Sequence, residues 1–264
     1  SIDNDRLTFV IPIRVDSAER ERNLDVVLEQ LSGIENADIS VWEGDIQPLY
    51  RLKKEYRNVK YRFIEDSDPV FHRTKYLNQF LRDAQGTVVG VWDTDVIVPE
   101  EQILDAAEAI RFGRAIMSFP YDGRFYTLSP DDSGQFVSDR SYKRLEEQMR
   151  NRHLAHGPHS VGGAFLVNRK KYLQSGGENE YFYGWGPEDA ERVKRIEILG
   201  QPVYRAKGPL FHLYHPRKEN SWYGSAEIEL KNRQEFLNVC SMTQEELQKY
   251  IQAWKWYSNN TRDA

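Results

Sequence analysis

Short apolar runs alternate with amphipathic stretches along the first 115 residues of the chain. Residues 87–92 (TVVGVW) are typical of a strand buried on both faces, whereas residues 19–31 repeat apolar side chains at helical spacing. The expected strands cover residues 7–13, 39–43, 59–63 and 87–92, and the expected helices cover residues 19–31, 75–83 and 100–112. This alternation predicts an α/β fold in which helices flank a mostly parallel sheet.

The second half of the chain is less regular. Residues 121–160 are polar and mixed, so we expect loops there, with one helix over residues 142–152. The further expected elements are strands at residues 161–167 and 202–206, a helix at residues 187–199, and a C-terminal helix opened by a capping box of Thr243 and Glu246. The sequence contains no internal repeat, low-complexity tract or clear linker, so we expect one domain over residues 1–264.

Composition narrows the class of protein. Lys and Arg total 36 against 41 Asp and Glu, and this well-mixed net charge of −5 argues against nucleic acid as a partner. Cys240 is the only cysteine, so no intramolecular disulfide can form, and a reducing compartment such as the cytoplasm is expected. No apolar run approaches the ~20 residues needed to cross a bilayer, and no signal sequence is recognisable.

Acidic residues follow the most apolar of the expected strands. Asp93 and Asp95 come directly after residues 87–92, and ligands of open α/β sheets bind beyond the carboxyl ends of the strands. Two such carboxylates can hold a divalent cation or a ribose hydroxyl, although a solvated turn has the same pattern. His212 and His215 offer imidazole ligands, which together with carboxylate suit Mn²⁺ or a similar first-row ion better than Ca²⁺. The alternative is one packed and one surface histidine.

Residues 184–189 (GWGPED) combine glycines, an aromatic ring and two adjacent carboxylates. A flat ring suits a sugar, and a neighbouring carboxylate can remove a proton from a sugar hydroxyl. The same segment also reads as a helix start, because Pro and acids favour the first turn. Arg14 and residues 71–75 (FHRTK) could meet a diphosphate and a base. The GxGxxG and GxxxxGK[ST] patterns are absent, so neither a dinucleotide fingerprint nor a P-loop is indicated.

Taken in order, these segments resemble the β-1,4-galactosyltransferase family of inverting glycosyltransferases with the GT-A fold. The specific elements are Phe-x-Arg-x-Lys-x-Leu-Asn at residues 71–78 and Gly-Trp-Gly-x-Glu-Asp at residues 184–189. The match is completed by residues 11–14 (IPIR), 93–95 (DTD), 161–164 (VGGA) and His215, so that it spans roughly residues 7–220. The resemblance implies a Rossmann-like, mostly parallel sheet flanked by helices, with an irregular, acceptor-binding second half.

The resemblance also implies substrates, a cofactor and residue roles. The donor would be a UDP-sugar, the cofactor Mn²⁺ or another divalent cation, and the acceptor a glycan or glycolipid. Asp189 would be the catalytic base, Asp95 and His215 would be metal ligands, and His212 would be an additional ligand. The substrate-binding residues would be Arg14, Phe71 and Arg73 at the uridine and diphosphate, Asp93 at the nucleotide, Gly163, Trp185 as the sugar platform, and Glu188 at sugar hydroxyls.

The same resemblance divides the expected domain into three stretches. Residues 1–115 would form a nucleotide-binding half, residues 116–222 a metal and acceptor half, and residues 223–264 a C-terminal helical segment. Animal members of the family typically have a membrane anchor and luminal disulfides, which this sequence does not show. A bacterial-type enzyme in the cytoplasm is therefore expected, with peripheral association at the inner face of the membrane as the other placement.

Two positions depart from the family pattern. Pro187 stands where the family usually has Gly, which stiffens the loop and removes one amide donor. Ser160 stands where galactose-using members have a bulky aromatic residue, and a smaller side chain would leave space for an N-acetyl group. The donor sugar is therefore expected to be Gal, GalNAc or GlcNAc.

Other interpretations of the same residues remain open at this point. One is a GT-A enzyme of the chondroitin-polymerase or polypeptide-GalNAc-transferase type, which has a similar metal site. Another is a non-catalytic protein that binds UDP-sugars or glycans. The carboxylate of Asp189 argues against a pure binder, because binding alone requires no general base.

Overall fold

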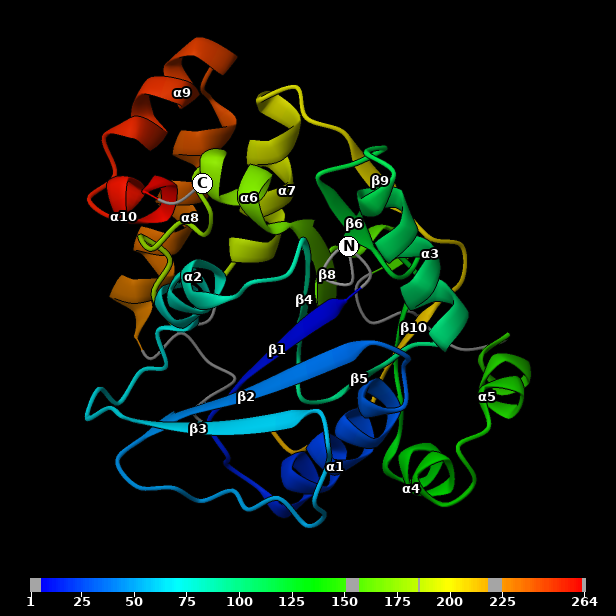
Figure 1. Cartoon of the computed structure of the whole chain (residues 1–264). Helices are drawn as coiled ribbons and strands as arrows, with labels where there is room; N and C mark the ends of the chain where they lie inside the picture. Colours follow the sequence, from blue (N-terminus) through cyan, green and yellow to red (C-terminus); the bar gives the residue numbers. More distant parts are fainter. Residues whose placement is uncertain (1–5, 151–156, 185, 218–224, 263–264) are drawn as a thin grey trace.

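A computed structural model of the chain describes residues 6–150, 157–184, 186–217 and 225–262 (Figure 1). Its main sheet has seven strands in the order β3-β2-β1-β4-β8-β6-β9. These strands are β1 (Leu7–Ile13), β2 (Ala37–Asp45), β3 (Val59–Glu65), β4 (Val88–Trp92), β6 (Met117–Phe119), β8 (Ala164–Asn168) and β9 (Val203–Arg205). The sheet therefore combines strands from both halves of the chain.

Most neighbouring strands of this sheet run parallel. Strand β1 is parallel to β2 and to β4, β2 is parallel to β3, and β6 is parallel to β9. Strand β8 is the exception, since it runs antiparallel to both β4 and β6. The strands expected from the apolar runs are confirmed, but β8 begins at Ala164 rather than at residue 161. Gly163 has a φ of 91°, which is incompatible with an extended strand.

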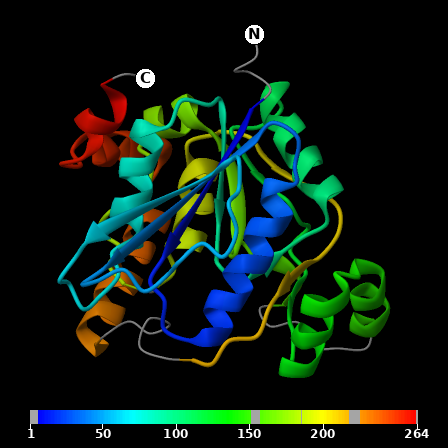
Figure 2. The ribbon, with the colours of Figure 1, turned by 60° about the horizontal axis from the view of Figure 1, so that its bottom comes forward.

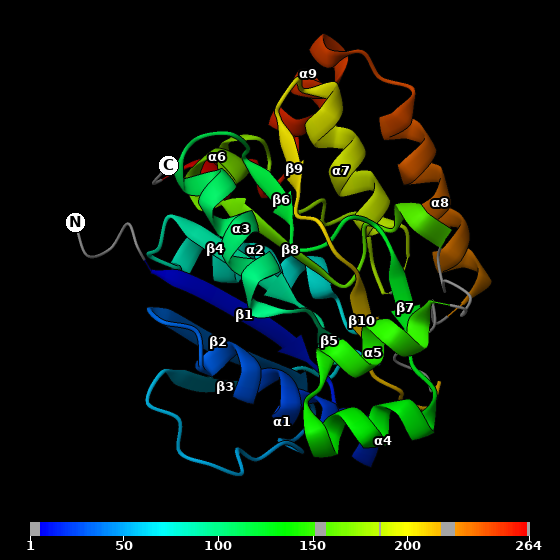
Figure 3. The same cartoon turned by 90° about the vertical axis from the view of Figure 1, so that its right-hand side faces the viewer.

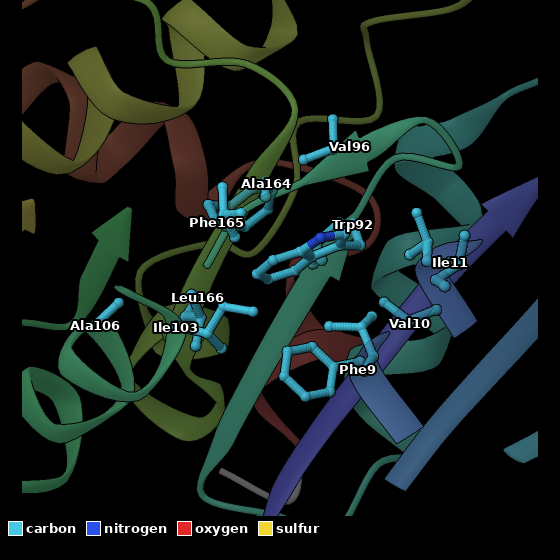
Figure 4. Close-up of a cluster of buried hydrophobic side chains, with 14 of the residues drawn as sticks. Phe9, Val10, Ile11, Trp92, Val96, Ile103, Ala106, Ala164, Phe165 and Leu166 are labelled. Atoms are coloured by element: carbon cyan, nitrogen blue, oxygen red, sulfur yellow. The ribbon is translucent and has the colours of Figure 1, made fainter. Parts of the chain in front are cut away.

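Large apolar side chains pack the centre of the sheet (Figure 4). Phe9 of β1 and Trp92 of β4 meet edge to face, with ring centroids 5.3 Å apart and an interplanar angle of 88°. Gly90 makes room for this contact, because a Cβ at that position would lie 2.5 Å from the Phe9 ring. Ile103 and Leu166 are fully buried in the same cluster. The packing fixes the end of β4, which the acidic segment follows.

Helices cover both faces of the main sheet. They are α1 (Ala18–Ser32), α2 (Arg73–Asp83), α3 (Glu100–Arg111), α6 (Arg169–Gln174) and α7 (Glu188–Ile198). Helix α1 connects β1 to β2 and α2 connects β3 to β4, so the two crossovers run in opposite directions along the sheet. Right-handed crossovers then place the helices on opposite faces, and Figure 2 shows them on opposite sides of β1. The helices predicted for α1, α2, α3 and α7 are confirmed within two residues at each end.

A second sheet was not predicted from the sequence. Its strands, in the order β5-β10-β7, are β5 (Val96–Ile97), β10 (Leu210–His212) and β7 (Phe125–Thr127). Figure 3 shows these strands close to helices α4 (Pro130–Asp139) and α5 (Tyr142–Met149). Helix α5 confirms the expected helix, although it ends at Met149, before the undescribed residues 151–156.

The expectation of loops around helix α4 is wrong. The Oγ of Ser129 accepts a hydrogen bond from the backbone N–H of Asp132, and Pro130 occupies the first turn. A serine followed by proline and acidic residues is a recognised helix start, so the signal was present in the sequence. The surrounding polar composition obscured it.

Three helices end the chain: α8 (Ala226–Cys240), α9 (Gln244–Gln252) and α10 (Tyr257–Thr261) (Figure 1). The predicted capping box is confirmed, because Thr243 accepts from the N–H of Glu246 at 3.2 Å and Glu246 accepts from the N–H of Thr243 at 3.1 Å. Within the described ranges, no helix has the length and apolar character needed to span a membrane.

Candidate active site

The site lies at the carboxyl ends of β1 and β4. These strands are parallel neighbours, Arg14 follows β1 directly, and Asp93 follows β4. Their ends therefore meet at one edge of the sheet, where open α/β folds bind ligands. Arg73, at the start of α2, reaches the same edge and places its Nη2 2.7 Å from Asp93 Oδ1. Two of the residues expected to bind substrate are thus brought into contact.

Three side chains with metal-binding groups converge at this edge. The ligand atoms of Asp95, His212 and His215 all lie within 4.8 Å of one another. The second sheet assembles them, because the antiparallel pairing of β5 with β10 places His212 opposite Val96, the residue after Asp95. The N–H of Leu213 also donates to the carbonyl of Asp95 at 2.8 Å. The three expected metal ligands therefore form one cluster.

Helix α1 supplies a residue that orients Asp95. Asn23 Nδ2 donates to Asp95 Oδ1 at 2.9 Å, and Thr94 Oγ1 donates to Asp95 Oδ2 at 2.9 Å. Asn23 is fully buried and also donates to the carbonyl of Tyr214 at 2.9 Å, in the segment between the two histidines. Such partners set the orientation of metal ligands. Asn23 was not predicted from the sequence, because a polar residue within an amphipathic helix normally faces solvent.

The two histidines offer imidazole nitrogens. His215 Nδ1 lies 3.0 Å from the carbonyl oxygen of Pro216, which can only accept, so Nδ1 donates there and Nε2 is the nitrogen that faces Asp95. Burial lowers the pKa of His212 and keeps its imidazole neutral. In the described part of the chain, the buried Nδ1 of His212 has no hydrogen-bond partner. A carboxylate with two imidazoles fits Mn²⁺ and other first-row divalent ions.

Arg14, directly after β1, lies against Phe71. The guanidinium carbon of Arg14 is 5.2 Å from the centroid of the Phe71 ring, and that ring is 5.2 Å from the ring of Tyr76. Arg14 also donates to the carbonyls of Gly44 at 2.7 Å and Asp68 at 2.8 Å, which ties β2 to the loop after β3. The resulting cationic and aromatic surface suits stacking with a planar base.

The remaining residues of the segment 71–78 hold the chain that leads into residues 184–189. Arg73, in the first turn of α2, faces Asp93, and other residues of this segment hydrogen-bond the backbone of residues 178–182. These bonds join His72 Nε2 to Glu180 O (3.0 Å), Thr74 Oγ1 to Phe182 O (2.9 Å) and Asn78 Nδ2 to Glu178 O (2.9 Å). The first motif therefore anchors the segment that leads into the second motif, which the linear pattern did not indicate.

Helix α7 presents Glu188 and Asp189 in its first turn. Burial raises the pKa of Glu188, and the negative charge of Asp189 raises it further. Burial also raises the pKa of Asp189, with a further contribution from the charge of Asp93. Asp189 Oδ2 lies directly against Gly162, where a Cβ would be only 2.7 Å away. The first turn of α7 is thus both the helix start that residues 184–189 predicted and the position of the expected catalytic base.

Buried ion pairs anchor α7. Arg192 Nε donates to Glu178 Oε2 at 2.7 Å, and Arg192 Nη2 pairs with Glu178 Oε1. Arg195 Nε donates to Glu191 Oε1 at 2.7 Å, and the side chains of both pairs are at most 4% exposed. The helical pattern gave no sign of these pairs, because charged side chains normally mark the solvent-facing side of a helix.

Ser160 is buried rather than open to the site. It is 7% exposed, and the hydroxyl of Tyr121 lies 3.1 Å from its Oγ. Tyr121 also donates to the carbonyl of Gly162 at 2.6 Å. A buried aromatic ring from another part of the chain therefore contacts the position where the family pattern has one, and this reduces the space expected beside Ser160.

Gly163 and Trp185 complete the expected set. A Cβ at Gly163 would lie 3.1 Å from Val96 and 3.2 Å from Leu210, so its missing side chain faces apolar groups. Its carbonyl accepts from the N–H of Asp93 at 3.0 Å, so Gly163 supports the site through its backbone. Trp185, the expected sugar platform, lies outside the described residues.

The mostly parallel sheet with its antiparallel β8 has the GT-A class of glycosyltransferase fold, as its likeness to two solved structures shows. A structure of GalNAc-T7 with UDP, GalNAc and Mn²⁺ matches 96% of this chain and 56% of its own at 14% identity, with a TM-score of 0.58. A structure of TarS 1-349 from S. aureus matches 78% of this chain and 60% of its own at 11% identity, with a TM-score of 0.51.

The family match covers one segment of the chain. Residues 147–219 match the family model for the N-terminal domain of galactosyltransferase. The catalytic domain of Drosophila beta1,4galactosyltransferase 7, in complex with xylobiose, is 19% identical over 76% of this chain and 64% of its own, with a TM-score of 0.45. The chain thus spans 56–64% of the length of these three structures. The expected GT-A fold and the resemblance to galactosyltransferases are confirmed.

Proposed function

We propose that this protein is a metal-dependent, inverting glycosyltransferase that moves a hexose or N-acetylhexosamine from a UDP-sugar to a glycan hydroxyl. The observation that carries the proposal is the convergence of two sets of groups at one edge of the sheet. One set is the ligand cluster of Asp95, His212 and His215, and the other is the carboxylate of Asp189. Asp93 connects them, since it follows the same strand as Asp95 and its N–H donates to the carbonyl of Gly163, the residue after the Gly162 that Asp189 contacts.

Asp189 would act as the general base. Inverting transfer requires one carboxylate that accepts the proton of the acceptor hydroxyl while that oxygen attacks the anomeric carbon. Burial raises the pKa of Asp189, which makes its carboxylate a stronger base than an ordinary aspartate. The buried Oε2 of Glu188 has no hydrogen-bond partner within the described ranges, so it can accept a hydrogen bond from a sugar hydroxyl. The two adjacent acids thus divide proton removal and sugar orientation between them.

Cationic and aromatic groups would hold the nucleotide. Arg73 can exchange its contact with Asp93 for a diphosphate oxygen, and Arg14 with Phe71 presents a stacking surface for uracil. Asp95, His212 and His215 would hold a divalent cation such as Mn²⁺, with Asn23 and Thr94 fixing the carboxylate. When bound, the cation would supply Lewis-acid neutralisation of the charge that builds on the departing diphosphate.

The donor sugar, the acceptor and the location are the finer parts of the proposal. Gal, GalNAc and GlcNAc remain the donor sugars to compare, because Ser160 departs from the aromatic residue of galactose-using enzymes while Tyr121 fills part of that region. The acceptor would be a glycan or glycolipid. The division into a nucleotide half, an acceptor half and a helical segment remains a prediction, as does the placement in a bacterial cytoplasm or at its membrane.

Replacement of the base tests this assignment. Asp189→Asn keeps the shape of the side chain but removes its basicity, so we expect UDP and Mn²⁺ to bind normally while turnover falls by about 10²–10⁴-fold. Binding is measured by calorimetry and turnover by UDP release from each of the three donors. Asp131→Asn is the matched control, because Asp131 is an exposed acid in the first turn of α4. Undiminished UDP release by Asp189→Asn would remove Asp189 from this role.

A further inference from the structure

Arg20 of helix α1 points into the cluster of Asp95, His212 and His215. Its Nε lies 3.5 Å from Asp95 Oδ2, and its Nη2 lies 3.3 Å from His215 Nε2. Asp95 Oδ2 and His215 Nε2 are also 3.5 Å from each other, and both are atoms that would coordinate a cation. The guanidinium therefore contacts the same ligand atoms that a divalent ion requires.

The contacts of this guanidinium are long. Its third partner is Asp16, whose Oδ2 lies 3.4 Å from Arg20 Nη1. Charge-assisted hydrogen bonds of Arg normally measure about 2.7–2.9 Å. Among the described residues, the buried Nε of Arg20 has no hydrogen-bond partner that meets normal geometry. The side chain is thus held near the cluster by charge, with donors left over for a better acceptor.

A guanidinium and a divalent cation cannot both use these atoms. The two positive charges repel each other, and Asp95 Oδ2 and His215 Nε2 cannot contact the guanidinium and coordinate the ion at the same time. A diphosphate changes this balance, because its oxygens match the donor fork of Arg and also coordinate divalent ions. Arrival of a nucleoside diphosphate would therefore give Arg20 new partners and release Asp95 and His215 to the metal.

We propose that Arg20 is a tethered cation that couples metal binding to nucleotide binding. In the nucleotide-free protein it occupies Asp95 and His215 and weakens their affinity for a divalent ion. In the complex it pairs with the diphosphate, so that UDP and the metal each strengthen the binding of the other by the same factor. This inference rests on the proposed function, since it requires UDP and a divalent cation to share the site.

The charge of Asp95 explains why removal of Arg20 should strengthen metal binding. Asp95 is 2% exposed, and without Arg20 its buried negative charge loses a cationic neighbour. A divalent ion would then bind without displacing any group of the protein. A purely structural role for Arg20 predicts the opposite, because loss of the side chain would loosen Asp95 and weaken metal binding.

Calorimetric titration of Mn²⁺, with and without saturating UDP, tests the coupling in the full chain. For Arg20→Gln we expect the Kd for Mn²⁺ alone to fall by about tenfold, and the factor by which UDP tightens Mn²⁺ binding to shrink by the same amount. Arg20→Lys keeps the charge and should retain most of the coupling. Arg233→Gln, which removes an exposed charge paired with Glu229 on α8, is the control and should match the unmodified protein.

The outcomes separate the two proposals. If Arg20→Gln binds Mn²⁺ alone no more tightly than the unmodified protein, or if UDP tightens Mn²⁺ binding equally in both, the role of Arg20 is overturned. Loss of coupling in Arg20→Lys to the same extent as in Arg20→Gln would also contradict a role for the charge. If the unmodified protein forms no complex with UDP and Mn²⁺ under any condition, the proposed function itself fails. Thermal unfolding of each variant confirms that the compared proteins are folded.

Discussion

Gly162 is the position at which a single methyl group most directly tests the placement of the catalytic base. A Cβ built there lies 2.7 Å from Asp189 Oδ2, and apart from its chain neighbours no other described residue has an atom within 4 Å. The backbone of Gly162 is outside the left-handed region, so alanine is compatible with its conformation. Gly162→Ala therefore perturbs one carboxylate and little else.

The geometry sets the expected size of the effect. An ordinary contact begins at about 3.4 Å, so the carboxylate must retreat by roughly 0.7 Å. Misplacement of a catalytic group by about 1 Å can cost about 10²-fold in rate. We therefore expect Gly162→Ala to lower kcat by about 10- to 100-fold. The oxygen is the free end of a short side chain, so the cost in folding stability should stay below about 1 kcal/mol.

Steady-state kinetics of UDP release, together with calorimetry and urea unfolding, separate these effects. KM for the donor and the Kd for UDP with Mn²⁺ should change little, because Arg73 and Asp95 do not contact the added methyl group. Gly134→Ala is the control, since Gly134 lies inside α4 and no described residue outside the adjoining helix backbone approaches its Cβ position within 4 Å. An unchanged kcat in Gly162→Ala would refute the reasoning, and so would a loss of activity that follows a loss of stability.

Three further predictions concern stability and pH. Glu178→Gln breaks the buried pair with Arg192 and should lower the free energy of unfolding by about 3–5 kcal/mol in urea titrations, whereas a loss under about 1 kcal/mol would show the pair to be unimportant. Gly134→Ala should raise the same quantity by about 0.5–1 kcal/mol, because alanine is the better helix former, and a decrease would count against the open surroundings of that position. Because burial raises the pKa of Asp189 and the base must be deprotonated, kcat/KM should fall with decreasing pH at a value clearly above the ordinary ~3.9 of an aspartate. An acidic limb at the ordinary value in the pH–rate profile would contradict burial of the base.

The parts of the fold with long periodic segments could be predicted from the sequence. Strand β4 is buried on all its residues and reads as an unbroken apolar run, and α1 repeats apolar residues on one face. Strands β5, β7 and β10 contain only two or three residues, so no periodicity marks them. Their pairing depends on contacts between distant segments, and it is this pairing that places His212 beside Asp95.

The candidate site likewise has residues that the sequence predicted and residues that only the tertiary structure reveals. The metal ligands and Asp189 were expected from their residue types and their order along the chain, and the structure brings Asp95, His212 and His215 into one cluster. Asn23 and Arg20 were missed, because polar residues within an amphipathic helix normally face solvent and only the tertiary structure turns these two toward Asp95. The anchoring of residues 178–182 by α2 was missed for the same reason, since it joins segments about a hundred residues apart.

The most direct test of the central claim is the product formed from UDP-Gal, UDP-GalNAc or UDP-GlcNAc with Mn²⁺ and a panel of glycan acceptors. The account predicts that the unmodified protein releases UDP with at least one donor, and that NMR of the product shows inversion at the anomeric carbon. Removal of the cation by a chelator should abolish the reaction, as should Asp189→Asn. Retention of configuration, or transfer that continues without a divalent cation, would contradict the account.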